Sequence, residues 1–234
     1  METRLPKINP TSESPFEGDL LERATPAATL RTLVDTFCEG CVMGLNGKWG
    51  SGKTTFLNMW QKYMERLGYK VIYFNSWEND SLEDPLIPII GEFYKLTDSN
   101  DSKWNAFTSN LGKISLAMLP TIMGMIAKEL TGLPIKEIIQ KGGEEGSKIL
   151  CKAIETYNEQ RKSVADFKKA LKEYVEENSN GKPVIFIIDE LDRCTPSFAV
   201  KTLERIKHFF EVENIIYLLA IDEVQLANSI KGFY

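Results

Sequence analysis

A short glycine-rich motif between two apolar segments limits what this chain of 234 residues can fold into. Residues 47–54 read Gly-Lys-Trp-Gly-Ser-Gly-Lys-Thr and match the pattern G-x-x-x-x-G-K-[ST]. An apolar run at residues 41–45 precedes the motif, and apolar side chains recur at helical spacing over residues 54–67. A strand, a glycine loop and a helix in this order predict an anion-binding loop. The alternative, a chance glycine-rich loop, does not account for the flanking segments.

The composition of this loop predicts how it binds phosphate. Its glycines let successive backbone N–H groups turn toward one anion, and the following helix adds the positive end of its dipole. Lys53 is expected to reach the β- and γ-phosphates and to assist catalysis, and the Thr54 hydroxyl is expected to bind Mg²⁺. Thr55 is a further candidate for the α-phosphate. The predicted phosphate-binding residues are Gly47, Lys48, Trp49, Gly50, Ser51, Gly52, Lys53, Thr54 and Thr55.

Two consecutive carboxylates complete the predicted site. Residues 183–188 are almost all apolar, as in a strand buried on both faces of a parallel sheet, and Asp189 and Glu190 follow directly. Open α/β sheets bind ligands at the carboxyl ends of their strands, so Asp189 is the expected second ligand of Mg²⁺. Glu190 is the expected catalytic residue that orients or deprotonates an attacking water. Alternatively, the two carboxylates only end a strand in solvent.

The alternation of apolar runs and amphipathic segments predicts the fold class. Further apolar runs at residues 71–74 and 215–221 indicate strands, and segments with helical periodicity lie between the strands. This order predicts an α/β domain with a doubly wound, mostly parallel sheet. We expect a flexible polar tail at residues 1–15, a domain over residues 16–234, and a helical insertion over about residues 79–180 between the phosphate loop and the two carboxylates.

Charge and cysteine content exclude several classes of function. The 28 Lys and Arg against 33 Asp and Glu give a net charge of −5, which provides no broad attraction for nucleic acid or an anionic membrane. The four cysteines form no metal-ligand pattern, and the N-terminal residues lack the apolar region of a secretory signal, so we expect a cytoplasmic protein. Residues 114–127 carry no charge but are fewer than the roughly 20 residues that span a bilayer.

Three motifs resemble the KAP family of P-loop NTPases. They are the loop at residues 47–54, Tyr-Phe-Asn-Ser-Trp at residues 73–77, and Ile-Ile-Asp-Glu-Leu-Asp-Arg-Cys at residues 187–194; the resemblance extends over nearly all of residues 19–234. It implies an ATPase of the additional-strand type with strand order 5-1-4-3-2 that uses ATP and Mg²⁺. It also implies a long insertion, in which residues 114–127 correspond either to a shortened membrane hairpin or to an internal helix. The first alternative implies peripheral association with the inner face of the membrane.

The C-terminal end departs from the family pattern. A fifth strand and a helical region with further arginines are expected after residues 223–230, but the sequence ends at Tyr234, so we expect both to be absent. The strand before the phosphate loop is then an open edge unless a partner protein or a second copy covers it. Arg193 either stabilises charge in a neighbouring subunit or pairs with Asp192 or Glu190.

The sequence is compatible with several functions. An ATP-hydrolysing nucleotide switch is favoured by the adjacent Glu190, and the family resemblance implies a role in phage defence or in signalling. A non-hydrolysing nucleotide-binding interaction module that needs a partner chain is the alternative. A small-molecule kinase would need a substrate-binding signature, which we do not find. A GTPase is disfavoured because the base-recognition motif Asn-Lys-x-Asp is absent from the sequence.

Overall fold

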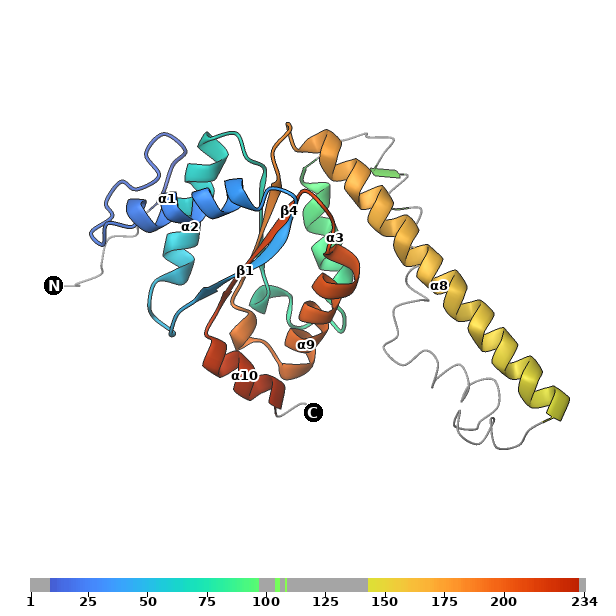
Figure 1. The fold of residues 1–234 in the computed structure, drawn as a ribbon. Helices are drawn as coiled ribbons and strands as arrows, with labels where there is room; N and C mark the ends of the chain where they lie inside the picture. The colour runs from blue at the N-terminus through green and yellow to red at the C-terminus, as the bar shows by residue number, and fades with distance from the viewer. Residues whose placement is uncertain (1–8, 97–103, 106–107, 109–142, 232–234) are drawn as a thin grey trace. The chain divides into compact units, whose positions relative to one another are not determined.

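The computed structural model describes residues 9–96, 104–105, 108 and 143–231, which form the elements drawn in Figure 1. The chain divides into two compact units, residues 1–100 with 172–234 and residues 101–171. The first unit contains the sheet. Its strands are β1 (Cys41–Asn46), β2 (Val71–Asn75), β3 (Val184–Asp189) and β4 (Ile215–Ile221). Its helices are α1 (Ala24–Thr36), α2 (Lys53–Arg66), α3 (Leu86–Tyr94), α9 (Pro196–Arg205), α10 (Glu223–Lys231) and the last turns of α8 (Gly143–Asn178).

The four strands form one parallel sheet in the order β1-β4-β3-β2. The register pairs Asn46 with Ile221 and Asn75 with Asp189, so the carboxyl ends of the strands meet at one edge of the sheet. Helices α1 and α2 cover one face, and α3 and α9 cover the other (Figure 1). The prediction of an α/β fold with a parallel sheet is confirmed.

The face toward α1 and α2 is filled mainly by aliphatic side chains. Because side chains alternate between the two faces of a strand, every second residue of β3 and β4 points to this side. Trp60 of α2 is fully buried there, and its indole N–H donates to the Ala27 carbonyl of α1 at 3.2 Å. The buried cluster includes Val34, Phe56, Leu57, Met64, Ile185, Ile187, Ile216, Leu218 and Ala220.

The opposite face of the sheet carries an aromatic cluster. The ring of Phe186 on β3 lies 5.1 Å from that of Phe93 on α3, 5.5 Å from Tyr217 on β4 and 6.3 Å from Phe74 on β2. The Tyr174 hydroxyl of α8 donates to the Phe93 carbonyl at 2.9 Å, which ties the end of α8 to α3. Rings at these separations stabilise a core beyond the area that they bury.

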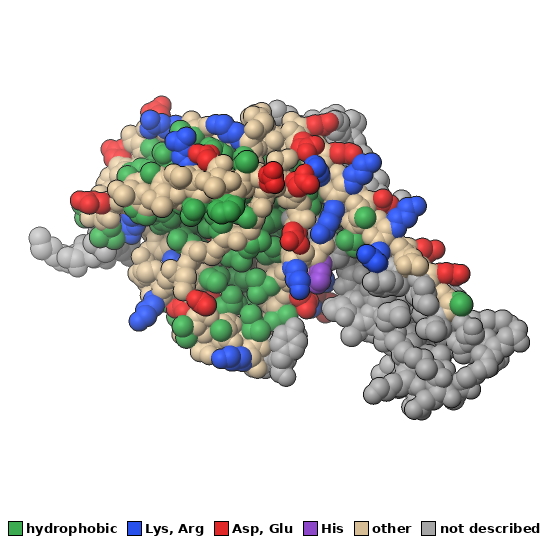
Figure 2. All heavy atoms as spheres, in the orientation of Figure 1, with side chains coloured by type: hydrophobic (Ala, Val, Ile, Leu, Met, Phe, Trp, Pro, Cys, Tyr) green, Lys and Arg blue, Asp and Glu red, His purple; other side chains and the backbone are tan. Residues whose placement is uncertain are grey.

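The central and edge strands differ in exposure. Every residue of β3 is buried, whereas residues of β1 alternate between half-buried and exposed, and Val42 is 51% exposed. In the described part of the chain, β1 pairs with β4 alone. This strand is therefore an edge strand in the structure, with Val42, Gly44 and Asn46 at its exposed positions. Hydrophobic side chains gather in the middle of the face shown in Figure 2, where Figure 1 draws β1.

The predicted insertion, residues 79–180, is described only in part. The described part contains α3 and the single long helix α8. Residues 114–127, and residues 1–8 of the predicted tail, lie outside the described residues. No helix in the described ranges combines the length and the apolar character that crossing a membrane requires.

Candidate nucleotide-binding site

The predicted phosphate loop connects β1 to α2 at the carboxyl edge of the sheet. The Gly47 N–H donates to the Ile221 carbonyl of β4 at 3.0 Å, which fixes the start of the loop. Gly52 has a φ of 86°, and a Cβ added there would lie 2.7 Å from Nη2 of Arg23. The positive φ is the reason for glycine at this position, since a Cβ would only displace the flexible end of the Arg23 side chain. Helix α2 begins at the next residue, Lys53, and directs its N-terminus at the loop.

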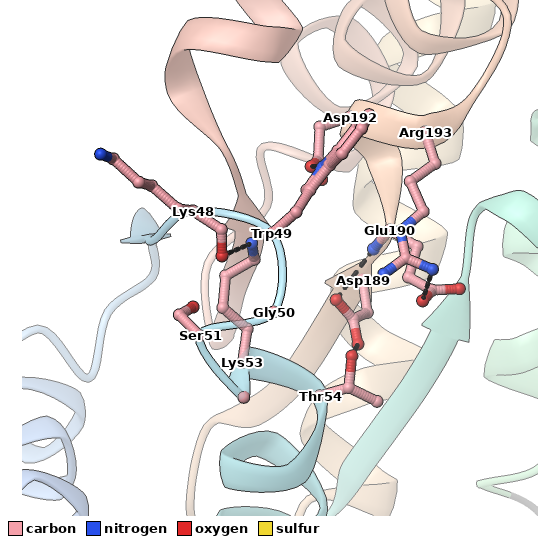
Figure 3. A pocket seen from close by; sticks show the side chains of 11 residues that line it. Lys48, Trp49, Gly50, Ser51, Lys53, Thr54, Asp189, Glu190, Asp192 and Arg193 are labelled. Atoms are coloured by element: carbon pink, nitrogen blue, oxygen red, sulfur yellow. Dashed lines mark hydrogen bonds and ion pairs between the residues drawn. The ribbon is translucent and has the colours of Figure 1, made fainter.

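A cavity of about 170 Å³ lies against this loop (Figure 3). The sequence-predicted residues Asp189 and Glu190 line it together with most of the loop. Gly47 and Thr55 are not among its lining residues, so a phosphate contact for either remains a prediction. The cavity is lined by Lys48, Trp49, Gly50, Ser51, Gly52, Lys53, Thr54, Asp189, Glu190, Asp192 and Arg193.

Lys53 is the cation inside the loop. Its Nζ donates to the Gly47 carbonyl at 2.5 Å and to the Lys48 carbonyl at 3.4 Å. The side chain of Lys48, in contrast, extends away from the cavity (Figure 3). The ammonium of Lys53 is thus held among backbone groups of the loop, where a phosphate that enters the loop meets it as a point charge.

Asp189 is 1% exposed and accepts three hydrogen bonds. The Thr54 hydroxyl donates to Oδ2 at 2.8 Å, the Tyr73 hydroxyl donates to the same oxygen at 2.7 Å, and the Glu190 N–H donates to Oδ1 at 2.8 Å. Burial, and then the neighbouring Asp189 carboxylate, raise the pKa of Tyr73 well above its usual value, so Tyr73 stays a donor. These contacts compensate for the burial of the carboxylate and fix it beside Thr54.

Glu190 has different surroundings from those of Asp189. Its backbone lies in the left-handed region with a φ of 60°, which turns the chain out of β3. Arg193 Nη1 lies 2.7 Å from Glu190 Oε1, and Asn75 Nδ2 donates to Oε2 at 3.2 Å. The side-chain Oδ1 of Asn75 accepts from the Trp77 N–H at 3.0 Å, so the Asn75 side chain is itself held in place.

The phosphate loop and the turn after β3 are joined above the cavity. The indole N–H of Trp49 donates to Oδ2 of Asp192, which is 7% exposed. Figure 3 shows the Trp49 ring extending from the loop toward Asp192. The sequence indicates Trp49 only as a loop residue and Asp192 only as a pairing alternative for Arg193, and their contact follows from the fold.

Tyr73 is a site residue that the sequence does not indicate, whereas Asn75, at the end of its strand, is left open by the sequence between a role in the site and ordinary turn chemistry. Both lie on β2, which pairs with β3 so that Asn75 is opposite Asp189. The polar side chain of Asn75 is nevertheless an indication in the sequence, because polar side chains at the carboxyl end of a strand face the ligand-binding edge of such sheets. Their partners follow only from the β2–β3 register.

The oxygen donors at Thr54 and Asp189 suit a magnesium ion. Hydroxyl and carboxylate oxygens are hard ligands, and Mg²⁺ commonly takes one or two carboxylates together with substrate phosphates and water. Within the residues described, no three His, Cys, Asp or Glu side chains gather to hold a metal by themselves. A magnesium ion at Thr54 and Asp189 would therefore complete its shell with phosphate oxygens and water.

These features together define a class of protein. A glycine loop at a helix N-terminus, and a Thr hydroxyl that contacts a buried Asp from another strand of the same parallel sheet, are the features of a P-loop nucleotide-binding domain. The family model of the KAP family P-loop domain matches residues 23–233. The chain therefore belongs to the KAP family of P-loop NTPases, and this membership supports nucleotide binding. A search of the curated proteins gave no match.

Proposed function

We propose that this chain binds ATP with Mg²⁺ and hydrolyses it to ADP and phosphate. The observation that carries the proposal is the contact between the Thr54 hydroxyl and the buried Asp189 carboxylate, 2.8 Å apart, beside a loop that holds Lys53. The adjacent carboxylate of Glu190 lines the same cavity, which favours water as the acceptor of the terminal phosphate.

Each residue has a distinct part in this proposal. The loop N–H groups and Lys53 bind and orient the β- and γ-phosphates, so their negative charge is compensated before reaction. Thr54 and Asp189 hold Mg²⁺, which when bound supplies positive charge to the phosphate oxygens. Glu190 orients the attacking water and accepts its proton. Asn75 and Arg193 determine where the Glu190 carboxylate points.

The wider setting of the proposal rests on the fold and the family. We infer the additional-strand type from the position of β4 between β1 and β3, with residues 16–234 as the nucleotide-binding domain and residues 79–180 as an insertion into it. The half-exposed β1 supports a partner protein or a second copy at that edge. A cytoplasmic role in phage defence or signalling is supported by the family resemblance alone.

The test is phosphate release by the purified chain with ATP and Mg²⁺. General-base catalysis is worth about 10²- to 10⁴-fold, so we expect Glu190→Gln to lose turnover by that factor while ATP binding persists. Measurements at low and high protein concentration show whether a second copy completes the site. Wild-type turnover equal to that of Glu190→Gln would contradict hydrolysis at this site.

One observation favours the alternative of a nucleotide-binding module that does not hydrolyse ATP. Both carboxylate oxygens of Glu190 are engaged, one by Arg193 and one by Asn75. A glutamate fixed in this way is a poorer acceptor for the proton of water. ATP binding that depends on Lys53, without phosphate release at any protein concentration, would favour this alternative.

A further inference from the structure

The ion pair between Glu190 and Arg193 lies at the cavity that the phosphate loop lines. Arg193 Nη1 is 2.7 Å from Glu190 Oε1, and both residues line that cavity together with Lys53. Figure 3 shows the Arg193 guanidinium beside the Glu190 carboxylate, with Glu190 directed toward Arg193 rather than toward the phosphate loop. The cation of Arg193 is thus close to the predicted phosphate position but paired with the predicted catalytic carboxylate.

The Arg193 guanidinium can leave Glu190 for another acceptor at a small cost in free energy. The Arg193 side chain is 43% exposed and that of Glu190 is 14% exposed, and an ion pair with one partner open to water shifts an equilibrium by about fivefold. A guanidinium binds phosphate oxygens through two parallel hydrogen bonds, which are stronger than its contact with one carboxylate oxygen. Because Arg193 ends the short turn Leu191–Arg193 at the cavity, a terminal phosphate in the loop competes with Glu190 for it.

We propose that Arg193 recognises the terminal phosphate of the bound nucleotide by exchanging Glu190 for that phosphate. The inference rests on the proposed nucleotide site and adds a specificity-determining residue to it. A nucleoside triphosphate takes the guanidinium and releases Glu190 toward the attacking water, whereas a diphosphate leaves the ion pair intact. The same exchange therefore favours ATP over ADP and makes the release of Glu190 depend on the presence of a γ-phosphate.

The first experiment compares the binding of two nucleotides in the presence of Mg²⁺. The probes are ADP and the non-hydrolysable imido analogue of ATP, and the proteins are the wild type, Arg193→Ala and Arg193→Lys. Loss of a charge-assisted contact lowers affinity by about 10-fold or more, so Arg193→Ala should lose that factor for the triphosphate and less than about twofold for ADP. Arg193→Lys should recover part of the loss. Arg66→Ala, which removes an exposed arginine at the end of α2, is the charge control.

The second experiment tests the exchange itself through a double-mutant cycle. If Glu190 competes with the terminal phosphate, Glu190→Gln frees Arg193 and strengthens triphosphate binding by about two- to fivefold. In the Arg193→Ala background this gain should disappear. A gain of the same size in both backgrounds would mean that Glu190 only repels the nucleotide, and the exchange would be rejected.

The two experiments separate this inference from the proposed function. An unchanged ratio of triphosphate to ADP affinity in Arg193→Ala, with ADP binding intact, overturns the role of Arg193 and leaves the nucleotide site standing. Equal weakening of both nucleotides overturns the preference for the terminal phosphate. Absence of binding of either nucleotide to the wild type rejects the site and the inference together.

Discussion

The floor of the site and the turn that follows β3 differ in how firmly they are held. The site floor consists of Lys53, Thr54, Tyr73 and Asp189, and the 190–194 turn begins at the next residue. Asp189 is nearly inaccessible and accepts three hydrogen bonds of 2.7–2.8 Å. The 190–194 turn carries a glutamate in the left-handed conformation, which forms an ion pair with the exposed Arg193. The two neighbouring carboxylates thus differ in their partners, because those of Asp189 are half-buried and one partner of Glu190 is open to solvent.

The 190–194 turn is held at several points, including its end, and only Arg193 within it is exposed. The Cys194 thiol donates to the Glu190 carbonyl at 3.5 Å, and burial followed by nearby carboxylates raises the pKa of Cys194 to about 12. The Thr195 hydroxyl donates to Asp80 at 2.7 Å. Between these fixed points only Arg193 is exposed, so a ligand can displace it without disturbing the core. The comparison distinguishes a closely bonded site floor from a 190–194 turn with one exposed cation.

The largest expected effect distinguishes the role of Asp189 from that of Glu190. Asp189→Asn removes the charge that would hold Mg²⁺, which is worth several kcal/mol, so turnover should fall by on the order of 10²-fold or more. ATP binding by this variant should also become insensitive to Mg²⁺. Glu190→Gln should lose turnover and keep magnesium-dependent binding. Phosphate release, and ATP binding with and without Mg²⁺, are measured for both variants. Identical behaviour of the two variants would contradict the distinction between the site floor and the 190–194 turn.

Lys53→Ala tests the cation of the site floor. Hydrogen bonds to charged groups contribute about 1.5–3 kcal/mol, so ATP affinity should fall by about 10- to 100-fold. The fold should persist, because Lys53 contacts only backbone carbonyls of its own loop in the contacts described. Lys62→Ala on the same helix removes a surface ion pair with Glu65 and is the matched control. Equal affinity of wild type and Lys53→Ala would place the phosphates elsewhere.

Two tyrosines, the half-buried Tyr73 and the buried Tyr217, test how much the site floor contributes to stability. The Tyr73 hydroxyl donates to Asp189, whereas the buried Tyr217 hydroxyl on β4 has no partner among the described residues. Tyr73→Phe should lower the free energy of unfolding by about 1.5–3 kcal/mol, and Tyr217→Phe should be nearly neutral or stabilising. Denaturant unfolding of both variants measures the difference. Equal effects would mean that the bond to Asp189 adds no stability.

The same tyrosines predict how stability changes at high pH. Burial, and for Tyr73 the Asp189 carboxylate as well, raise their pKa values above the ordinary value of about 10. Above pH about 10, the folded state then binds more protons than the unfolded state. The stability that these two tyrosines contribute is therefore constant below that pH and declines above it. Tyr73→Phe should decline less steeply than wild type. Denaturant midpoints measured from pH 8 to 11 check this, and parallel curves would contradict it.

Trp49→Phe should have the smallest effect, because it removes one partly exposed link between floor and turn. Trp49 is 55% exposed, so loss of its bond to Asp192 should cost about 0.5–1 kcal/mol, or about two- to fivefold in ATP affinity. The change should appear mainly as faster ATP dissociation. Stopped-flow dissociation measures it, and a loss as large as that of Lys53→Ala would show that the turn is part of the site floor.

Much of the fold could be predicted from sequence because the central strands are buried on both faces. β3 and β4 are continuous apolar runs for that reason, and they were predicted within one residue of their observed bounds. Helix α3 could not be predicted, since Pro88 and Gly91 weaken its local signal. Its start depends on Asp84, which accepts from the Leu86 N–H at 2.9 Å. Asp84 in turn pairs with Arg205, which is 121 residues away in the sequence.

Site residues that belong to a contiguous motif could be predicted from the sequence. Site residues whose contacts cross from one strand to another could not. Lys53, Thr54, Asp189 and Glu190 are recognisable from their immediate neighbours, and the structure brings all four to one cavity. Tyr73 becomes a partner of Asp189 only through the β2–β3 register, and the contact of Trp49 with Asp192 spans 143 residues. Arg193 was left with two alternatives by the sequence, and the structure pairs it with Glu190.

The most direct test of the site is a crystal structure of the chain with Mg²⁺ and the imido analogue of ATP. We predict that the β- and γ-phosphates lie in the loop at residues 47–54, with Lys53 Nζ moved from the Gly47 carbonyl to a phosphate oxygen. The metal should contact the Thr54 hydroxyl and lie beside Asp189. A nucleotide bound outside this loop, or a metal near neither Thr54 nor Asp189, would contradict the account.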